Sequence, residues 1–336
     1  MKPRIMAATC LLASVAFAGV LTAQTVRETG QGFVIQLRPL DPAGQPPVIT
    51  AVCLHPQGKL LAVAGDDHLV RIWDLERMAV VTCLESHTDW VRTVAFSPDG
   101  RLLATAGNDR RLLLWDQRQG SEPTVLAIHP QAISQVAFSH DGRLLAAVGF
   151  DAKLRVYDVT RGVLQYELAC PCQDMRALAF SPSSTQVAAG GRSGKVRVWQ
   201  LGEDVTSVDY HPHRQRIRAL AFSPDARQIV SASEDRTIYV ASTGDVDAGF
   251  ALDCGREKVF SICFIAPGHL ICGGSDNHVR WWDLESRTEL TRLTGHTGSV
   301  AAVSCNGNLI ASGSFDTTVR IWSVEFVTSA NSFRIK

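Results

Sequence analysis

Residues 91–116 read VRTVAFSPDGRLLATAGNDRRLLLWD, and this stretch decides how the chain folds. A short apolar strand ends at Phe96, and a Ser-Pro-Asp-Gly turn follows at residues 97–100, where Pro and Asp-Gly are natural turn formers. A second strand is expected over residues 102–106, a tight turn at Asn108 and Asp109, and a third strand that ends at Trp115. A fourth strand completes the unit, and residues 80–84 are the equivalent strand of the first unit. Short strands separated by turns are typical of all-β proteins.

The same unit recurs along the chain at an almost constant period. Alignment on the residue that closes each unit gives steps of 42, 42, 42, 42, 41 and 40 residues, which define seven units. Four strands per unit at this period predict the blades of a β-propeller. We therefore expect an all-β, seven-bladed propeller of four-stranded antiparallel blades over residues 33–324. The closing positions are Trp73, Trp115, Tyr157, Trp199, Ala241, Trp282 and Trp322.

These features resemble the WD-repeat (Trp-Asp repeat) family. Four of the closing aromatics are followed by Asp, a His precedes the first strand of a unit, and an Asp lies six residues before Trp115. The resemblance is specific for the fold, whereas one fold can carry many functions. It also implies buried chains of hydrogen bonds that join Asp, His, a hydroxyl and the indole N–H within one blade. The two sets that match are His87, Thr105, Asp109 and Trp115, and His296, Ser312, Asp316 and Trp322.

A ring of blades needs one more strand, because the last blade otherwise leaves an exposed edge. Residues 33–37 (FVIQL) alternate apolar and polar side chains just before the first blade, so we expect this N-terminal strand to close the ring. Residues 326–333 are the rival candidate. With the N-terminal strand in place, residues 24–32 become a short linker and residues 325–336 a C-terminal tail.

The first 23 residues have the layout of a secretory signal peptide. Lys2 and Arg4 precede an uncharged run from Ile5 to Leu21, and small-residue cleavage patterns end at Ala18 and at Ala23. An uncleaved membrane anchor is the alternative, although the run is short for a membrane span. We therefore expect an exported protein, whether periplasmic, in the envelope or secreted, with a cytoplasmic location as the alternative.

The cysteines favour that cytoplasmic alternative. Cys53, Cys263, Cys272 and Cys305 fall inside strands expected to be buried, where a free Cys acts as a small apolar side chain. We expect these four thiols to be unpaired. An exported protein usually pairs its cysteines.

The composition and motifs do not favour catalysis or metal binding. Lys and Arg number 33 against 33 Asp and Glu, so no global charge points to nucleic acid or an anionic membrane. His213, Ser231 and Asp235 are the residue types of a hydrolase triad, but they repeat the spacing of the structural sets and lack an oxyanion-hole motif. Cys170 and Cys172 lack two further ligands for a tetrahedral metal site. We expect no catalytic residues, no metal and no cofactor.

A binding surface is expected on the loops at one end of the ring. Three positions in each blade are expected to lie there. In the second blade they are Trp90 and Arg92, six and four residues before Phe96, and Asn108, which precedes the turn Asp; the other blades have equivalent positions. They hold six cations, three acids and four aromatics, and Arg and aromatic residues are common interface anchors. The positions are Val48, Thr50, Asp66, Trp90, Arg92, Asn108, Ala132, Ser134, Phe150, Asp174, Arg176, Arg192, Arg216, Arg218, Glu234, Lys258, Phe260, Ser275, Ser299, Ala301 and Phe315.

The function that follows is a non-catalytic scaffold whose basic and aromatic face binds a protein or peptide partner with acidic side chains. Trp90, Phe150, Phe260 and Phe315 would be its apolar anchors. The opposing interpretation is that the Arg residues are solvated or bridge neighbouring blades. The sequence also permits a small-ligand or glycan sensor in the envelope, a propeller hydrolase, and an intracellular ubiquitin-ligase substrate receptor, because residues 115–118 resemble the Trp-Asp-x-Arg box. It leaves the oligomeric state open.

Overall fold

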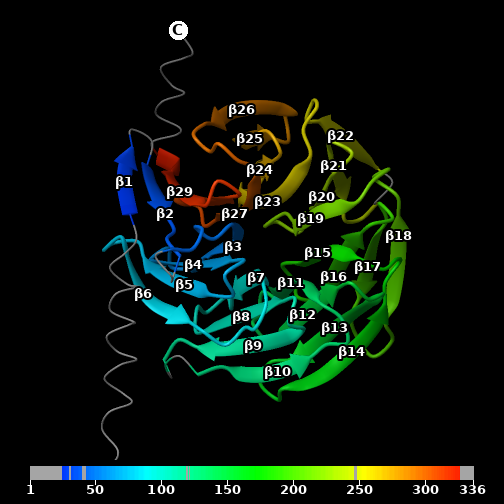
Figure 1. Ribbon diagram of the computed structural model, residues 1–336. Helices are drawn as coiled ribbons and strands as arrows, with labels where there is room; N and C mark the ends of the chain where they lie inside the picture. The colour runs from blue at the N-terminus through cyan, green and yellow to red at the C-terminus, as the bar shows by residue number, and fades with distance from the viewer. Residues whose placement is uncertain are drawn as a thin grey trace, which may run out of the picture.

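Seven β-sheets stand around a common axis, and the chain passes through them in order (Figure 1). This computed structural model describes residues 25–29, 32–39, 43–118, 120, 122–245 and 248–325. The sheets contain 29 β-strands, and Val324 and Glu325 at the end of the described residues have helical backbone, so the predicted seven-bladed propeller is confirmed. The described part contains no helix with the length and apolar character needed to cross a membrane. The expected signal peptide and residues 326–336, which include the rival closing strand, lie outside the described residues.

Blades one to six are four-stranded antiparallel sheets whose strands follow the sequence order from the axis outward. Blade one comprises β3 (Ile49–Leu54), β4 (Leu60–Gly65), β5 (Val70–Asp74) and β6 (Ala79–Leu84). Blade two comprises β7 (Val91–Phe96), β8 (Leu102–Gly107), β9 (Arg111–Asp116) and β10 (Thr124–Ile128). Blade three comprises β11 (Ile133–Phe138), β12 (Leu144–Gly149), β13 (Lys153–Asp158) and β14 (Val163–Ala169).

The next three blades repeat this arrangement. Blade four comprises β15 (Met175–Phe180), β16 (Gln186–Gly191), β17 (Val196–Gln200) and β18 (Thr206–Tyr210). Blade five comprises β19 (Ile217–Phe222), β20 (Gln228–Ser233), β21 (Thr237–Ser242) and β22 (Gly249–Asp253). Blade six comprises β23 (Val259–Ala266), β24 (His269–Gly274), β25 (Val279–Asp283) and β26 (Thr288–Leu293).

Blade seven is built from both ends of the chain. It comprises β27 (Val300–Cys305), β28 (Leu309–Ser314), β29 (Thr318–Ser323), β2 (Gly32–Gln36) and β1 (Thr25–Thr29). Strand β2 pairs antiparallel with β29, with Ile35 opposite Val319, so the predicted N-terminal closure is confirmed.

Strand β1 differs from the sequence expectation. It pairs with β2 as a fifth strand, so the prediction of a linker over residues 24–32 is wrong for residues 25–29. Thr25, Val26 and Thr29 are β-branched and favour extended backbone. The outer edge of β2 offers the unpaired backbone groups to which such a segment can bond.

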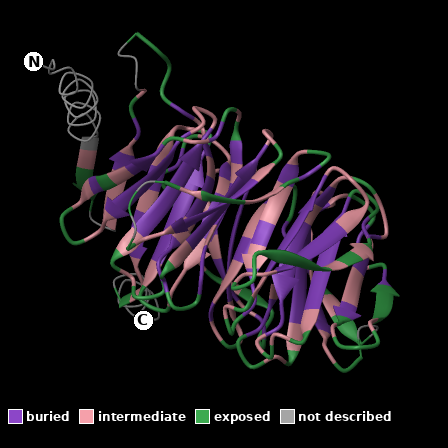
Figure 2. Ribbon diagram, turned by 90° about the horizontal axis from the view of Figure 1, so that it is seen from below, coloured by how far each residue is buried: buried purple, intermediate pink, exposed green. Residues whose placement is uncertain are grey.

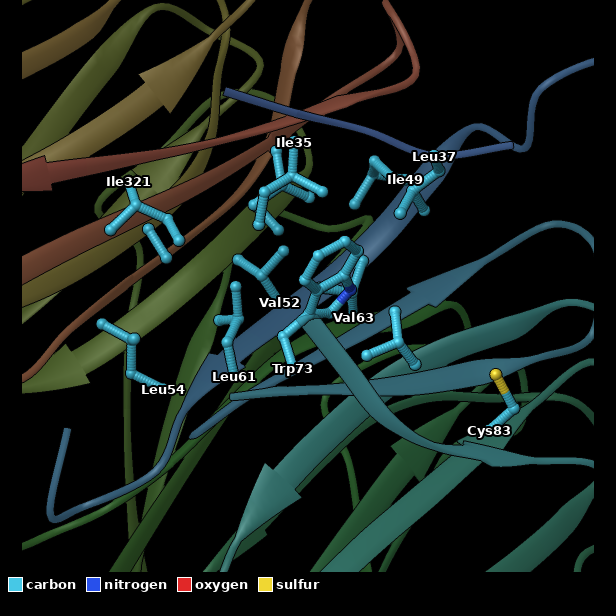
Figure 3. Close-up of a cluster of buried hydrophobic side chains, with 14 residues drawn as sticks. Ile35, Leu37, Ile49, Val52, Leu54, Leu61, Val63, Trp73, Cys83 and Ile321 are labelled. Atoms are coloured by element: carbon cyan, nitrogen blue, oxygen red, sulfur yellow. The ribbon is translucent and has the colours of Figure 1, made fainter. Parts of the chain in front are cut away.

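The core lies between the blades. Each of seven clusters of buried apolar side chains spans two neighbouring blades. In the cluster between blades seven and one, the fully buried Trp73 packs beside Val63 and Ile49, and Ile35 and Ile321 complete it from blade seven (Figure 3). Figure 2 shows buried residues inside the blades and exposed ones on the loops and several outer strands. Each such buried side chain contributes about 2 kcal/mol, so the ring is held by contacts between blades.

A disulfide joins Cys263 of β23 to Cys305 of β27, with the two Cα atoms 6.1 Å apart. The expectation that both thiols are unpaired is therefore wrong. The two residues are 42 positions apart in the sequence, which is one repeat, and they lie on neighbouring inner strands. Cys53 and Cys272 are free, as expected, and the other free thiols of the described residues are Cys83, Cys170, Cys172 and Cys254.

Candidate partner-binding site

Every inner strand carries a β-bulge just after its first residue. In each blade the register between the first two strands skips one residue there, and a bulge of this kind redirects the unpaired side chain. All seven skipped residues line a single cavity of about 550 Å³, at the end of the axis where the inner strands begin. They are Thr50, Arg92, Ser134, Arg176, Arg218, Phe260 and Ala301.

Cations outnumber acids among the side chains that line the cavity, although the whole chain is neutral. Among the described residues that line it, Arg92, Arg176 and Arg218 are cations and Asp66 is the only acid. One carboxylate oxygen of Asp66 accepts a hydrogen bond from the backbone N–H of Val48 at 2.9 Å. Three guanidinium groups therefore face one carboxylate that already has a partner.

A chain of ion pairs holds the cations of blades four and five. The carboxylate of Asp174 lies 2.5 Å from Nε of Arg176 and 2.8 Å from Nη2 of Arg216. Glu234 then receives Nη1 of Arg216 at 3.3 Å and Nη1 of Arg218 at 3.5 Å. Arg216 lies between both acids, whereas Arg176 and Arg218 end the chain at the cavity. The interpretation in which Arg residues bridge neighbouring blades therefore describes Arg216.

Two aromatic rings support the guanidinium groups. Phe150 lies between Arg176, whose Cζ is 4.3 Å from the ring centroid, and Arg92, whose Cζ is 5.4 Å away. Cζ of Arg218 lies 5.2 Å from the centroid of Phe260. Contacts of this kind are worth about 0.5–1 kcal/mol at exposed sites. Both rings contact arginines, and Phe260 also lines the cavity, whereas Phe150 is not among the lining residues.

Arg176 destabilises the charged forms of Arg92 and Arg218. Burial lowers the pKa of Arg92, and the positive charge of Arg176 lowers it further. The pKa of Arg218 is lowered by the same two causes in the same order. The charged forms are therefore less stable here than in water, although arginine stays protonated. An anion placed among these groups would relieve this penalty.

The opposite rim of the cavity is apolar. Trp90 of blade two is 45% exposed, and Phe315 of blade seven is 51% exposed. They stand on either side of blade one and line the same cavity as the cations. Blades four and five, which carry Arg176 and Arg218, lie across the ring from blade one (Figure 1).

The remaining predicted face residues fall into two groups. Asn108 accepts a hydrogen bond from Nε of Arg92 at 2.5 Å, so it positions a cavity cation as Asp174 and Glu234 do. Arg192 and Lys258 are exposed, and neither is among the residues that line the cavity. The cavity also has a second layer of lining residues that the repeat positions did not predict, including Thr93, Gln135 and Ser261, which directly follow the bulges. Polar residues at this point of an apolar strand were the available signal.

The hydrogen-bond sets expected to be structural are present in blades two and seven. His87 bonds Asp109 through Nδ1 at 2.8 Å and Thr105 through Nε2 at 2.7 Å, and the indole N–H of Trp115 donates to Thr105 at 2.9 Å. The corresponding distances in the set of His296, Asp316, Ser312 and Trp322 are 2.9, 2.8 and 3.2 Å. These side chains lie inside the blades and tie loops to strands.

The triad-like set of blade five has the same buried arrangement. His213 bonds Asp235 at 3.1 Å and Ser231 at 2.8 Å, and Ser231 is fully buried. Burial lowers the pKa of His213, an effect that Asp235 opposes. The Ser231 hydroxyl is thus a partner of His213 inside the blade and has no contact with solvent, so a substrate cannot reach it.

The Cys-Pro-Cys segment does not gather ligands in the described part of the chain. Cys172 Sγ lies 3.6 Å from Sδ of Met175, and Cys170 is buried. Among the described residues, no group of three or more His, Cys, Asp or Glu side chains is placed to hold a metal ion.

Relatives match short parts of the chain. Mitochondrial division protein 1 of Pyricularia oryzae is 37% identical over 70 residues, which is 20% of this chain and 11% of that protein. The Periodic tryptophan protein 2 homolog of Schizosaccharomyces pombe is 40% identical over 70 residues, covering 19% and 8%. Ribosome biogenesis protein YTM1 of Yarrowia lipolytica is 35% identical over 79 residues, covering 21% and 16%. The chain therefore spans less than a fifth of the length of each of these relatives.

The family comparison covers nearly the whole ring. The model described as "WD domain, G-beta repeat" matches seven times, once for each blade. The matches cover residues 41–74, 78–116, 120–158, 162–200, 202–241, 252–283 and 287–323. With seven matched repeats, a ring of seven blades and the buried Asp-His-hydroxyl-Trp sets, the chain belongs to the WD-repeat family.

Proposed function

We propose that this protein is a non-catalytic scaffold that binds a protein or peptide partner at the cavity end of the ring. The observation that carries the proposal is the cavity itself, into which all seven bulged residues project. Its rim combines arginines held by ion pairs with exposed aromatic side chains, and such residues dominate the energetics of protein interfaces. The seven blades form a rigid frame that fixes their positions, which lowers the entropy lost on binding.

The charge of the site favours an acidic partner. Arg92, Arg176 and Arg218 outnumber Asp66 in the cavity lining, and Arg92 bonds the neutral Asn108 in place of an acid. Arg216 supports this surface indirectly, because both of its carboxylate partners also hold a cavity cation.

Charge reversal in the double variant Arg216→Glu/Arg218→Glu tests the proposal. The wild-type chain, this variant and the control Arg227→Glu would each be used to isolate partners from extracts of the source organism, with quantitative mass spectrometry as the readout. Arg227 is a suitable control because it is exposed and lies in the turn between β19 and β20, at the other end of the blade. We expect the face variant to lose partners that the control retains. Equal recovery by all three folded proteins would overturn the proposed binding face.

A small-ligand or glycan sensor is the second candidate. The cavity volume of about 550 Å³ favours it, because ligand pockets commonly span about 300–1,000 Å³. A screen by thermal unfolding tests it, since a bound ligand raises the melting temperature by mass action. A ligand that raises the melting temperature of the wild type and not of Arg176→Gln would favour the sensor over the scaffold.

We also propose that the protein is exported. The layout of residues 1–23 supports export, and so does the disulfide between Cys263 and Cys305, because stable disulfides are rare in reducing compartments. Export would place the partner in the envelope or outside the cell, and it would separate the chain from any ubiquitin ligase.

A further inference from the structure

We infer that the cavity is a two-ended receptor for one linear peptide segment, which places an acidic side chain between Arg176 and Arg218 and an apolar side chain against Trp90 and Phe315. This inference rests on the proposed function and adds the chemistry and direction of the bound segment. It predicts that the acidic and apolar residues of the partner occur at a constant spacing in its sequence.

The acidic end is preorganised by residues that the ligand does not need to move. Asp174 and Glu234 hold Arg176 and Arg218 from one side, and Phe150 and Phe260 contact the same two guanidinium groups. The side chain of Arg176 is 19% exposed and that of Arg218 is 30% exposed, so each retains a small accessible part. A carboxylate can accept hydrogen bonds from such fixed donors with little loss of side-chain entropy.

Asp174 links the two blades from a position with left-handed backbone. Its backbone φ is 58°, in the left-handed region that non-glycine residues seldom occupy. Its carboxylate is the group that links Arg176 of its own blade to Arg216 of the next blade.

The apolar end differs in exposure from the rest of the cavity. Trp90 and Phe315 project from the two blades that flank blade one, and each is about half exposed. Between them lie Val48 and Thr50, with Asp66 bonded to the backbone of Val48. An apolar side chain resting here would cover both rings, while a second acidic side chain would meet the carboxylate of Asp66. The charge distribution therefore gives the segment one orientation.

A display library of random linear peptides, selected on the full-length protein, tests the inference. Binding of the enriched peptides would be measured by fluorescence anisotropy with the variants Arg176→Gln/Arg218→Gln and Trp90→Ala/Phe315→Ala. The matched controls are Arg192→Gln/Lys258→Gln, which removes two exposed charges outside the cavity, and Val208→Ala/Leu290→Ala, which trims exposed apolar residues on outer strands. Circular dichroism would verify that all variants are folded.

We expect enriched peptides to share an acidic and an apolar residue at one spacing, and to lose about tenfold or more in affinity with either cavity variant. The controls should bind within about twofold of wild type. If the arginine variant weakens binding and the Trp90/Phe315 variant does not, the two-ended receptor is overturned while the proposed function stands. If no peptide is enriched, the two-ended peptide receptor is overturned, while the proposed function stands because a folded protein partner also satisfies it. If peptides are enriched and neither cavity variant weakens their binding, both are overturned.

Discussion

One carboxylate oxygen of Asp174 on blade four lies 2.8 Å from Nη2 of Arg216 on blade five, and the other lies 2.5 Å from Nε of Arg176. A single acid therefore joins two blades and positions a cavity cation. Its backbone lies in the left-handed region, which asparagine also tolerates. Replacing the carboxylate by an amide thus tests the charge without changing the backbone.

We expect Asp174→Asn to lower the free energy of unfolding by about 1–2 kcal/mol. The variant leaves Arg176 and Arg216 with one fewer anionic partner, and both are partly buried, so solvent screens the loss incompletely. Urea unfolding followed by fluorescence measures the change. Asp225→Asn is the matched control, because the Asp225 side chain is 40% exposed in a turn at the other end of blade five. Equal losses in the two variants would contradict a special role for Asp174.

Thr105→Val tests the buried hydrogen-bond set of blade two. Valine has almost the same shape as threonine but cannot accept from the indole N–H of Trp115 or bond Nε2 of His87. Two buried nitrogens would lose their partner, so we expect a loss of about 2–4 kcal/mol in unfolding free energy. The exposed Thr124 of β10 provides the control Thr124→Val, which should change stability by less than about 0.5 kcal/mol. A loss below about 1 kcal/mol for Thr105→Val would show that the set contributes little.

We expect the free energy of unfolding to fall in mild acid, because the buried His129 resists protonation in the folded state. Burial lowers the pKa of His129 to about 4, and the positive charge of Arg155 acts in the same direction. In the unfolded chain the imidazole binds its proton near pH 6.5, so between about pH 6.5 and pH 4 the unfolded state binds more protons than the folded state. This contribution to stability is complete above the unfolded pKa and is lost as the pH falls, by about 2 kcal/mol between pH 7 and pH 5.

His129→Gln is the variant that isolates this effect. Glutamine does not titrate, but it can still bond the Tyr157 hydroxyl, which lies 2.9 Å from Nε2 of His129. Urea unfolding of both proteins at pH 7 and pH 5 should give a smaller acid loss for the variant. Identical losses would mean that His129 is not the group responsible.

The disulfide predicts a definite pattern of cysteine modification. If the denatured, unreduced protein is alkylated and mapped by mass spectrometry, Cys263 and Cys305 should stay unmodified while the six free cysteines of the described residues react. After reduction, all of them should react. The double variant Cys263→Ser/Cys305→Ser should lose about 4 kcal/mol of stability, the chain-entropy value for a loop of 42 residues. Alkylation of both residues before reduction would show that the thiols are free in the native protein.

The proposal of export predicts the mass of the mature protein. Cleavage at the expected sites would remove the first 18 or 23 residues, and cell fractionation would find the shortened protein outside the cytoplasm. An intact N-terminus on a protein in the cytoplasmic fraction would overturn the proposal. Export would then no longer account for the disulfide, and the partner would be sought in intracellular complexes.

The fold could be predicted because its physical requirement repeats. Trp73, Trp115 and Trp322 are all fully or nearly fully buried at equivalent places between blades, so the spacing of large closing side chains marks each blade. The alternating pattern of residues 33–37 likewise identified the closing strand, since a strand at this place needs one buried face. Strand β1 was not predicted, because its sequence has no pattern of buried and exposed side chains. It pairs with the outer edge of β2, which is in place only when β2 has paired with β29.

The site could be predicted only in part. Repeat positions identified the residues at the cavity, such as Arg176 and Phe315, because the same bulge recurs in every blade. The contacts of Phe150 with two arginines could not be inferred, since they depend on side-chain rotamers across a blade boundary. The separation of Cys263 and Cys305 by one repeat could have indicated a disulfide, because equivalent positions of successive inner strands lie side by side. The expectation that cysteines in buried strands are unpaired led to the opposite prediction.

The pairing of β2 with β29 has a consequence for the order of events during synthesis. The ribosome makes Ile35 near the beginning of the chain, but its register partner Val319 belongs to the last described strand. Until β29 emerges, the apolar face of β2 has no sheet to join, and the apolar face that blade one turns toward blade seven lacks its partner. Ring closure is therefore among the last folding steps, and a chaperone that shields β2 would protect the protein while the rest of the chain is translated.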